Sequence, residues 1–411
     1  MLDRLKLAQL AARFARTRAF VVHRGAVPVI CAALAASGTI AIASCDSSGS
    51  TGPINVTAGR QTFRFDTFGD EKFWTDTLHM NDVVETVDPV TALSVGLKVD
   101  ADTLPPSVLA AIQAGQVNLR DPATTVALLK LGAVVGVVAT VDENNHVTRF
   151  GVTCALCHST VDDRIAPGIG SRLDGRPNRD LNPGAIIALS PALTAAQKAV
   201  YNSWGAGRYD PRFNFDGINA PVVISPAYGL AGIHSVTFTG DGNDIEYWNR
   251  YVAVTQMHGQ GDFSEPRLGI DIHQSPDLVA PRLAALQAYQ LGIQAPAPPA
   301  GSFDPVAAAR GKAVFNGAGK CATCHAGTLL TDANVRLHAP SEVVTEPGYA
   351  ARSATKMYRT SPLAGVWQHP PYFHDGSAPT LDAVVARYNT VKNLHLTPQQ
   401  MADLVQYLKS L

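Results

Sequence analysis

The runs Cys154-Ala155-Leu156-Cys157-His158 and Cys321-Ala322-Thr323-Cys324-His325 follow one pattern, Cys-x-x-Cys-His. This pattern is the signature of covalent haem attachment. Two thiols at this spacing reach the two vinyl groups of one haem, and the histidine that follows is delivered to the iron as its proximal ligand. The sequence therefore predicts two covalently bound haems c, with His158 and His325 as iron ligands.

Two other kinds of site also use Cys-x-x-Cys pairs. Structural zinc sites bring two pairs together over short spacings, whereas residues 159–320 separate the two runs here. A thioredoxin-like dithiol lies in a βαβ context, which the sequence predicts around neither run. The chain has six cysteines, and the other two, Cys31 and Cys45, lie near the N-terminus. We therefore expect the four motif cysteines to serve haem attachment.

The N-terminal segment, residues 1–44, has the order of an export signal. Residues 1–24 carry six basic side chains and one acidic one, and residues 26–43 are an uncharged run. The sequence Ile42-Ala43-Ser44-Cys45 resembles a bacterial lipobox, which implies cleavage before Cys45 and its lipidation. A single transmembrane anchor is the alternative, since the run is nearly long enough to span a bilayer. Both place the protein outside the cytoplasm, and we expect a lipid anchor at the periplasmic face of a bacterial membrane.

The charge balance bears on the partners. The chain has 34 acidic and 33 basic residues, and six of the basic ones fall in the export signal. The remainder is mildly acidic, which argues against a nucleic-acid partner and fits a redox donor protein or a quinol-linked electron chain. The sequence does not indicate an oligomeric state.

A proline-rich stretch, residues 296–302, divides the chain, because it cannot continue a helix and extends as a spacer. After the signal we expect a flexible linker at residues 45–60, an N-terminal haem domain with insertions at 61–295, and a C-terminal cytochrome c domain at 303–411.

Local patterns predict the main elements. Asp121-Pro122 and Asp304-Pro305 each read as an N-cap followed by proline at the first helical position, and Thr397 opens a capping box. Residues 133–141 and 146–152 predict a hairpin leading into Cys154. Residues 204–261 predict ordered loops with short helices. The predicted fold is mainly α, with two cytochrome c-like helical domains, the first elaborated with long loops and a short β-hairpin.

Residues outside the haem motifs match a known family. Pro371-Tyr372-Phe373-His374-Asp375-Gly376-Ser377 and Thr380-Leu381, with weaker matches at residues 358–363 and 219–221 and at Tyr228, resemble the bacterial di-haem cytochrome c peroxidase family. That family includes the methylamine-dehydrogenase-maturing enzymes. The resemblance implies two facing cytochrome c-like domains, with a calcium ion between them in many members. Asn219 and the backbones of His369 and Pro371 match the calcium-binding places.

The resemblance also suggests sixth ligands for the two irons. Where the peroxidases place an axial methionine, this chain has Tyr388, as in the maturing enzymes, in which a tyrosine is the ligand. Met357 is the other candidate for the second haem, as the only methionine between that motif and the terminal helix. For the first haem the candidates are Met257 and His258, and an iron without a sixth ligand is the alternative.

The chemistry of the first haem is less clear from the sequence. The peroxidases carry a Glu-Met pair for acid/base work, and the matching residues here are Gln256-Met257. An amide cannot shuttle a proton as a carboxylate can. We take Gln256 and His258 as candidate catalytic residues. Two functions stay open: an oxidoreductase that reduces peroxide or another oxidant at the N-terminal haem, and an electron-transfer cytochrome in which both irons are six-coordinate.

Overall fold

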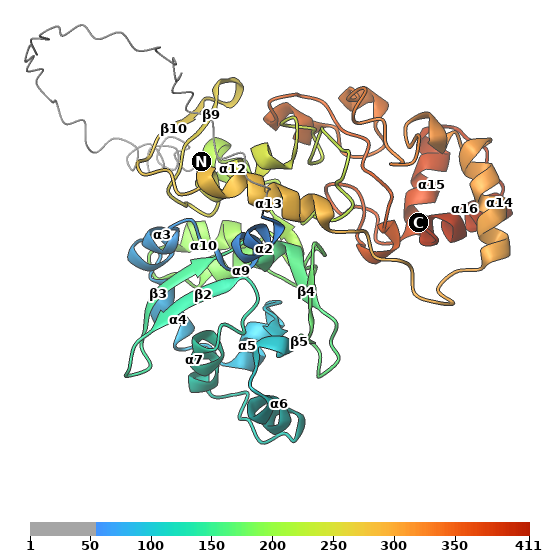
Figure 1. Ribbon diagram of the computed structural model, residues 1–411. Coiled ribbons are helices and arrows are strands. Elements are labelled where there is room, and N and C mark those ends of the chain that lie inside the picture. Colours follow the sequence, from blue (N-terminus) through green and yellow to red (C-terminus); the bar gives the residue numbers. More distant parts are fainter. Residues whose placement is uncertain (1–54) are drawn as a thin grey trace, which may run out of the picture. The chain divides into compact units, whose positions relative to one another are not determined.

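The computed structural model describes residues 55–411 (Figure 1). The predictions for the export signal, for Cys45 and for residues 46–54 fall outside these residues. Helices predominate, and within residues 55–411 the strands form five two-stranded sheets. The prediction of a mainly helical chain with few strands is confirmed. None of the helices in this part of the chain is both long enough and apolar enough to cross a bilayer.

The helices up to residue 295 are mostly short. They are α2 (Val56–Phe65), α3 (Glu71–Asp76), α4 (Met80–Val84), α5 (Pro89–Ser94), α6 (Pro106–Gln113), α7 (Pro122–Lys130), α8 (Ala155–His158), α9 (Pro183–Ala188), α10 (Ala195–Asn202), α11 (Phe213–Asp216), α12 (Ile245–Thr255) and α13 (Ala280–Gly292). After the proline-rich stretch come α14 (Pro305–Asn316), α15 (Leu381–Val391) and α16 (Pro398–Lys409), joined by 3-10 turns.

The paired strands are short as well. They are β1 (Val99–Asp100) with β5 (Ile169–Gly170), β2 (Val137–Val141) with β3 (Val147–Val152), β4 (Ser159–Val161) with β6 (Arg172–Asp174), β7 (Arg208–Tyr209) with β8 (Val222–Val223), and β9 (Phe263–Glu265) with β10 (Ile270–Ile272). All pairs are antiparallel except the first.

The predicted helix starts are confirmed. The side chains of Asp121 and Asp304 accept hydrogen bonds from the first turns of α7 and α14, and Thr397 forms a complete capping box at α16. The predicted linker, residues 45–60, is wrong at its end, because residues 56–60 are the first turns of α2. Asn55 caps that helix through a hydrogen bond from the backbone N–H of Ala58. Gly59, within the predicted linker, instead serves helix packing.

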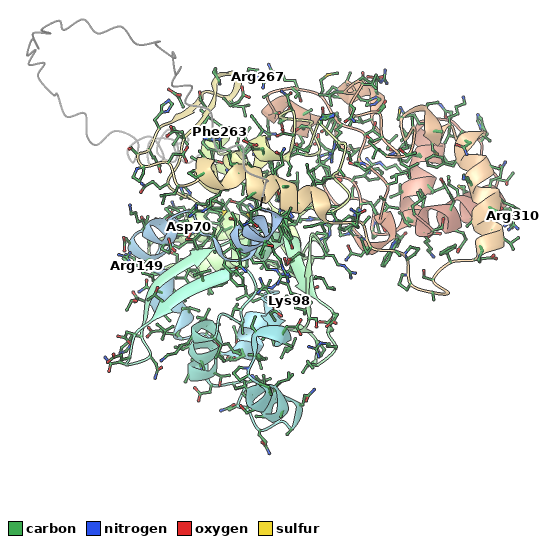
Figure 2. The ribbon with its side chains drawn as sticks, in the orientation of Figure 1. Asp70, Lys98, Arg149, Phe263, Arg267 and Arg310 are labelled. Atoms are coloured by element: carbon green, nitrogen blue, oxygen red, sulfur yellow. The ribbon has the colours of Figure 1, made fainter. Side chains whose placement is uncertain are left out.

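In the C-terminal part, α14 and α16 cross at a glycine. A Cβ atom added to Gly311 would lie 2.0 Å from the backbone oxygen of Asp403 and 2.9 Å from the Cβ of Tyr407. Four residues after this glycine, Phe315 packs on Tyr407 with ring centroids 5.1 Å apart. Arg310, at the outer side of α14 in Figure 2, forms a bidentate pair with the Asp403 carboxylate at 2.7 and 2.8 Å.

The same arrangement occurs between α2 and α13. A Cβ atom on Gly59 would lie 1.9 Å from the backbone oxygen of Ala285 and 2.8 Å from the Cβ of Tyr289. Four residues after this glycine, Phe63 packs on Tyr289 with ring centroids 5.6 Å apart. Each crossing therefore joins a helix preceding a Cys-x-x-Cys-His run to a helix following it, with glycine, phenylalanine and tyrosine in equivalent places.

The hairpin of β2 and β3 leads directly into the first haem motif. It pairs from Val137 with Val152 to Val141 with Val147, as predicted, although β2 begins four residues later than expected. Figure 1 shows α3 and α4 beside the hairpin, and their apolar side chains share one buried cluster with it. A second buried cluster lies within residues 314–408 and is formed by α14, α15, α16 and the turns between them.

Candidate haem sites

Backbone hydrogen bonds hold the last two residues of the first motif, Cys157 and His158. Cys154 precedes α8, and Cys157 and His158 form its end. The backbone oxygen of Cys157 accepts a hydrogen bond from the N–H of Asn178 at 2.9 Å, and that of His158 accepts one from Gly175 at 2.8 Å. The turn after β6 therefore fixes the orientation of the motif.

The imidazole of His158 is oriented by the backbone. Its Nδ1 lies 3.0 Å from the carbonyl oxygen of Ser225, and burial lowers the pKa of His158 to about 4. A neutral ring whose Nδ1–H donates to a carbonyl leaves Nε2 with its lone pair free, the state that an iron ligand requires.

The second motif repeats this arrangement. Cys321 begins a 3-10 turn (Cys321–Thr323), and Nδ1 of His325 lies 3.2 Å from the carbonyl oxygen of Leu330. Burial lowers the pKa of His325 as well. Both histidines predicted as iron ligands are therefore neutral, half-buried and held through Nδ1 by a main-chain oxygen.

The four cysteines of the motifs are free and half-buried. Burial raises the pKa of Cys154 and Cys157 to about 12 and that of Cys321 to about 11. Metal-binding cysteines are thiolates, and these environments disfavour a thiolate. Within residues 55–411 the four sulfurs do not converge on one metal-binding group. The four motif cysteines therefore fit thioether attachment to haem better than zinc binding.

Two half-buried arginines fit the acidic groups of haem. Nε and Nη1 of Arg179 and Nε of Arg359 are buried and lack hydrogen-bond partners. Burial lowers the pKa of each guanidinium to about 10. After burial, the positive charge of Arg179 further lowers the pKa of His158, so Arg179 lies near the first motif. Haem carries two propionates, and unpaired guanidinium N–H groups are suitable partners for carboxylates.

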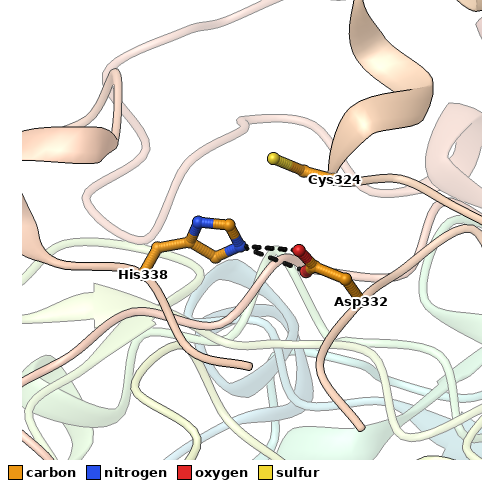
Figure 3. Close-up of side chains that lie close together, drawn as sticks. All are labelled: Cys324, Asp332 and His338. Carbon is orange, nitrogen blue, oxygen red and sulfur yellow. Dashed lines mark hydrogen bonds and ion pairs between the residues drawn. The ribbon is translucent and has the colours of Figure 1, made fainter. Parts of the chain in front are cut away.

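Cys324, Asp332 and His338 form a compact group beside the second motif (Figure 3). Nε2 of His338 lies 3.0 Å from a carboxylate oxygen of Asp332 and 3.0 Å from the hydroxyl of Thr360. One potential ligand atom from each member lies within 4.8 Å of the others. A thioether to haem would use the Cys324 sulfur, so we interpret the group as a polar support for this motif.

Tyr388 lies near the second motif. It belongs to α15, and its ring packs 6.2 Å from that of Phe373. Burial, with smaller contributions from the nearby Cys321 and Cys324, raises its pKa to about 12. The structure thus brings this candidate ligand to the cysteines that would hold the second haem. The other candidate, Met357, is half-buried and is bonded through its backbone N–H to the Thr355 hydroxyl at 3.1 Å.

Gln256 is buried and linked to the first motif through Tyr209. The Tyr209 hydroxyl donates a hydrogen bond of 2.8 Å to the side-chain oxygen of Gln256, whose NH₂ group donates to the Thr255 hydroxyl at 3.0 Å. Burial raises the pKa of Tyr209, and the thiol of Cys157 is among the groups that raise it further. Tyr209 therefore lies close to both Gln256 and Cys157.

Met257 and His258 occupy different environments. Met257 is 6% exposed and belongs to the larger apolar cluster, and its backbone oxygen accepts a hydrogen bond from the indole of Trp74 at 3.2 Å. His258 has a positive φ of 64°, and its ring stacks on Phe73 with centroids 3.7 Å apart. Burial lowers the pKa of His258 to about 4. Met257 is thus packed as a core residue, whereas His258 keeps a neutral, ligand-capable ring.

The residues suggested for calcium do not fit that ion here. The side-chain oxygen of Asn219 accepts a hydrogen bond from the Trp204 indole at 2.9 Å, and its NH₂ group donates to Ser203 at 2.9 Å. The backbone oxygen of His369 accepts a hydrogen bond from Arg179 at 2.9 Å. A guanidinium at this carbonyl would repel a divalent cation, so the predicted calcium site is not supported.

Three features near the motifs were not predicted from the sequence: the phenol of Tyr209, the pair Asp332 and His338, and the buried guanidiniums of Arg179 and Arg359. Each comes from a loop or a short element, and isolated residues there carry no spacing pattern. The run of prolines and aromatics around residue 372 indicated a family-like region of the sequence. It does not indicate which polar groups would face a haem.

Comparisons with known proteins bear on the family. A family description, RoxA-like and cytochrome c-like, matches residues 357–390. A cytochrome-c peroxidase, IdrP1, of Denitromonas iodatirespirans is 30% identical over a region covering 25% of this chain and 40% of that protein. This chain therefore spans less than half the length of the curated relative that it matches.

Two solved structures are also similar. Hydrazine synthase of Kuenenia stuttgartiensis, pressurised with xenon, aligns with 47% of this chain and 73% of its own at 21% identity and a TM-score of 0.33. A MauG-like protein associated with microbial copper homeostasis aligns with 47% of this chain and 74% of its own at 18% identity and a TM-score of 0.32.

Proposed function

Because the chain belongs to the di-haem cytochrome c peroxidase family, we propose that it is a two-haem c-type cytochrome that transfers electrons. We further propose that it reduces peroxide or another oxidant at the N-terminal haem. The repeated crossings at Gly59 and Gly311 support two cytochrome c-like domains, one for each haem.

The observation that carries this proposal is the matched pair of half-buried histidines. His158 and His325 each follow two cysteines, and each has Nδ1 within hydrogen-bond distance of a main-chain oxygen, at 3.0 and 3.2 Å. This second contact fixes the ring and increases its basicity as a ligand. The same local geometry at two places far apart in the sequence supports two equivalent iron sites.

A bound haem would supply one-electron chemistry at its iron. The chain's own residues would hold it: the cysteine sulfurs at the ring edge, the two histidines on the proximal sides, and Arg179 and Arg359 toward the propionates. Because those guanidiniums are buried without full hydrogen bonding, pairing with a carboxylate would satisfy donors that the protein leaves open.

Near the first haem, Tyr209 and Gln256 provide hydrogen-bonding groups, whereas the matching position of the peroxidases carries a carboxylate. The phenol and the amide can orient an oxidant through hydrogen bonds. Neither carries a proton that it readily gives up near neutral pH, since burial raises the pKa of Tyr209. We therefore expect slow turnover with peroxide, with proton delivery as the slow step.

The alternative is a non-catalytic electron-transfer cytochrome. The neutral ring of His258 favours it, because such a ring can ligate an iron and close the site. In that case the family scaffold would space two redox centres, and Tyr388 and His258 would be the sixth ligands.

We propose that the protein works outside the cytoplasm, attached to the periplasmic face of a bacterial membrane by a lipid on Cys45. The basic and apolar order of residues 1–44 and the lipobox-like run support this location. A redox donor protein or a quinol-linked chain would supply the electrons.

Optical and EPR spectra of the purified protein, oxidised and reduced, with and without cyanide, test the function. The oxidoreductase proposal predicts one low-spin iron and one iron that binds cyanide and is perturbed by peroxide. A His258→Ala variant is the matched probe, since it should leave the first iron's spin state unchanged if the site is open. Two low-spin irons inert to cyanide in every redox state would replace the oxidoreductase with the electron-transfer alternative.

A further inference from the structure

A cavity of about 410 Å³ opens between α2, α13 and β6. Its walls include four arginines, Arg60, Arg64, Arg172 and Arg176, and a single carboxylate, Asp174. None of its lining residues belongs to a Cys-x-x-Cys-His run. The volume lies in the range typical of small-molecule sites, and the excess of guanidiniums indicates an anionic ligand.

The carboxylate in the cavity is already compensated. Asp174 lies 2.6 Å from Nε of Arg64 and accepts hydrogen bonds from the Tyr289 hydroxyl at 2.5 Å and from the Ser159 hydroxyl at 2.8 Å. Asp174 and Arg64 therefore neutralise each other as part of the wall. They leave Arg60 and Arg176 to set the charge of the cavity, since Arg172 lies 2.8 Å from the Asp100 carboxylate.

Arg172 is buried and incompletely satisfied. Its side chain is 1% exposed and its Nε lies 2.8 Å from a carboxylate oxygen of Asp100. None of its three guanidinium nitrogens, however, has an aligned hydrogen-bond partner. Buried donors without partners are rare in proteins and point to a group that binds there. An oxyanion could accept two parallel N–H groups of this guanidinium.

Arg60 and Arg176 lie on other parts of the same wall. Arg60 is exposed on α2, one turn before Arg64, and Arg176 is half-buried just after β6. Among residues 55–411, no acidic side chain forms an ion pair with either of them. Leu173 and Ile293 add apolar surface between the charged groups. The cavity thus offers one deep guanidinium, two further positive charges and an apolar wall.

We propose that this cavity binds a small organic anion with two or more oxyanion groups, of the carboxylate or phosphate class. One oxyanion would pair with Arg172 and another with Arg60 and Arg176. The site is separate from both haem motifs. Its wall adjoins the first one, since Asp174 bonds to Ser159, the residue after His158, and the N–H of Gly175 donates to the His158 backbone oxygen.

Isothermal titration calorimetry on the full haem-loaded protein tests the proposal, with citrate and pyrophosphate as probes. The salt is kept near 0.15 M, so that weak surface attraction is screened. We expect saturable binding of at least one probe with one site per chain. The probe that binds more tightly assigns the carboxylate or the phosphate class.

The variant Arg60→Gln/Arg176→Gln should weaken this binding by roughly tenfold or more, because hydrogen bonds to charged groups are removed. It spares the buried pair of Arg172 and Asp100, so folding should be retained. Arg120→Gln, an exposed arginine outside the cavity, is the matched control and should change the affinity less than twofold. The absence of binding by both probes, or equal weakening by the control and the double variant, would overturn the proposal.

Discussion

The hydroxyl of Tyr209 donates a hydrogen bond of 2.8 Å to the side-chain oxygen of Gln256, at a buried position near Cys157. This contact joins strand β7 to the end of α12 and sets a phenol and an amide side by side near the first Cys-x-x-Cys-His run. A phenol and an amide can orient a bound oxidant but do not readily transfer a proton. In this respect the proposed site differs from that of a peroxidase with a carboxylate at the position of Gln256.

Gln256→Glu should raise peroxide turnover by about tenfold or more, because a positioned carboxylate can carry the proton that the amide cannot. The measurement is steady-state peroxide reduction with a chemical electron donor, after the haem content of each variant has been matched. Met257→Leu is the control, since it alters the neighbouring core residue without adding a titratable group. An intact Gln256→Glu protein with unchanged turnover would argue against Gln256 acting at the oxidant site.

Tyr388→Phe should change the oxidised spectrum of the second haem and raise its reduction potential, because an anionic oxygen ligand stabilises the oxidised iron. Tyr407→Phe is the matched control: Tyr407 also lies near Cys321 but packs on Phe315 in the helix crossing. It should leave the spectrum unchanged and cost about 1 kcal/mol or less. If the two variants behave alike in spectroelectrochemical titration, Tyr388 is a core residue.

Asp70 should make the fold less stable as the pH rises. Burial raises the pKa of this carboxyl to about 9, against 3.8 for the free group, so the folded state keeps a proton that the unfolded state loses. Stability from this group is present below pH 4 and is lost as the pH rises to 9, by up to about 1.4 kcal/mol per pH unit. Asp70→Asn keeps a neutral acceptor for the Val152 N–H, and denaturant unfolding at pH 6 and pH 8 should show a smaller loss for it. If the wild type loses no more stability than the variant between pH 6 and pH 8, the raised pKa of Asp70 is contradicted.

Gly311→Ala should destabilise the C-terminal part by about 1–3 kcal/mol, because the added Cβ would lie 2.0 Å from the Asp403 backbone oxygen. Gly292→Ala, in a helix and with no atom within 4 Å of its added Cβ, is the control and should be neutral or stabilising by about 0.5–1 kcal/mol. Thermal unfolding followed by circular dichroism compares the two. Equal stabilities would mean that α14 and α16 do not meet as described.

The sequence predicted those elements whose causes are local. Asp121, Asp304 and Thr397 cap their helices as their side chains allow, and the hairpin before Cys154 follows from alternating residues on either side of a polar turn. The start of α2 was not predicted, since it lies within residues 45–60, where a linker was expected. The role of Gly59 depends on Ala285, more than two hundred residues away, and no local pattern encodes that contact.

The residues of the candidate site also fall into those that could be predicted from the sequence and those that could not. The cysteines and proximal histidines could be predicted, because attachment chemistry fixes their spacing. Tyr388 came from resemblance, and the structure brings it near Cys321 and Cys324. Asn219 was suggested as a calcium ligand by resemblance, whereas its amide bonds to Trp204 and Ser203. Long-range packing decides such contacts, so the residue type alone did not reveal them.

The number of covalently bound haems per chain tests the central claim most directly. A pyridine haemochrome assay on protein of known concentration, with the intact mass of the denatured chain, measures it. The account predicts two haems for the wild type. The double variants Cys154→Ala/Cys157→Ala and Cys321→Ala/Cys324→Ala should each retain one. A wild-type chain carrying one covalent haem, or none, would contradict the account.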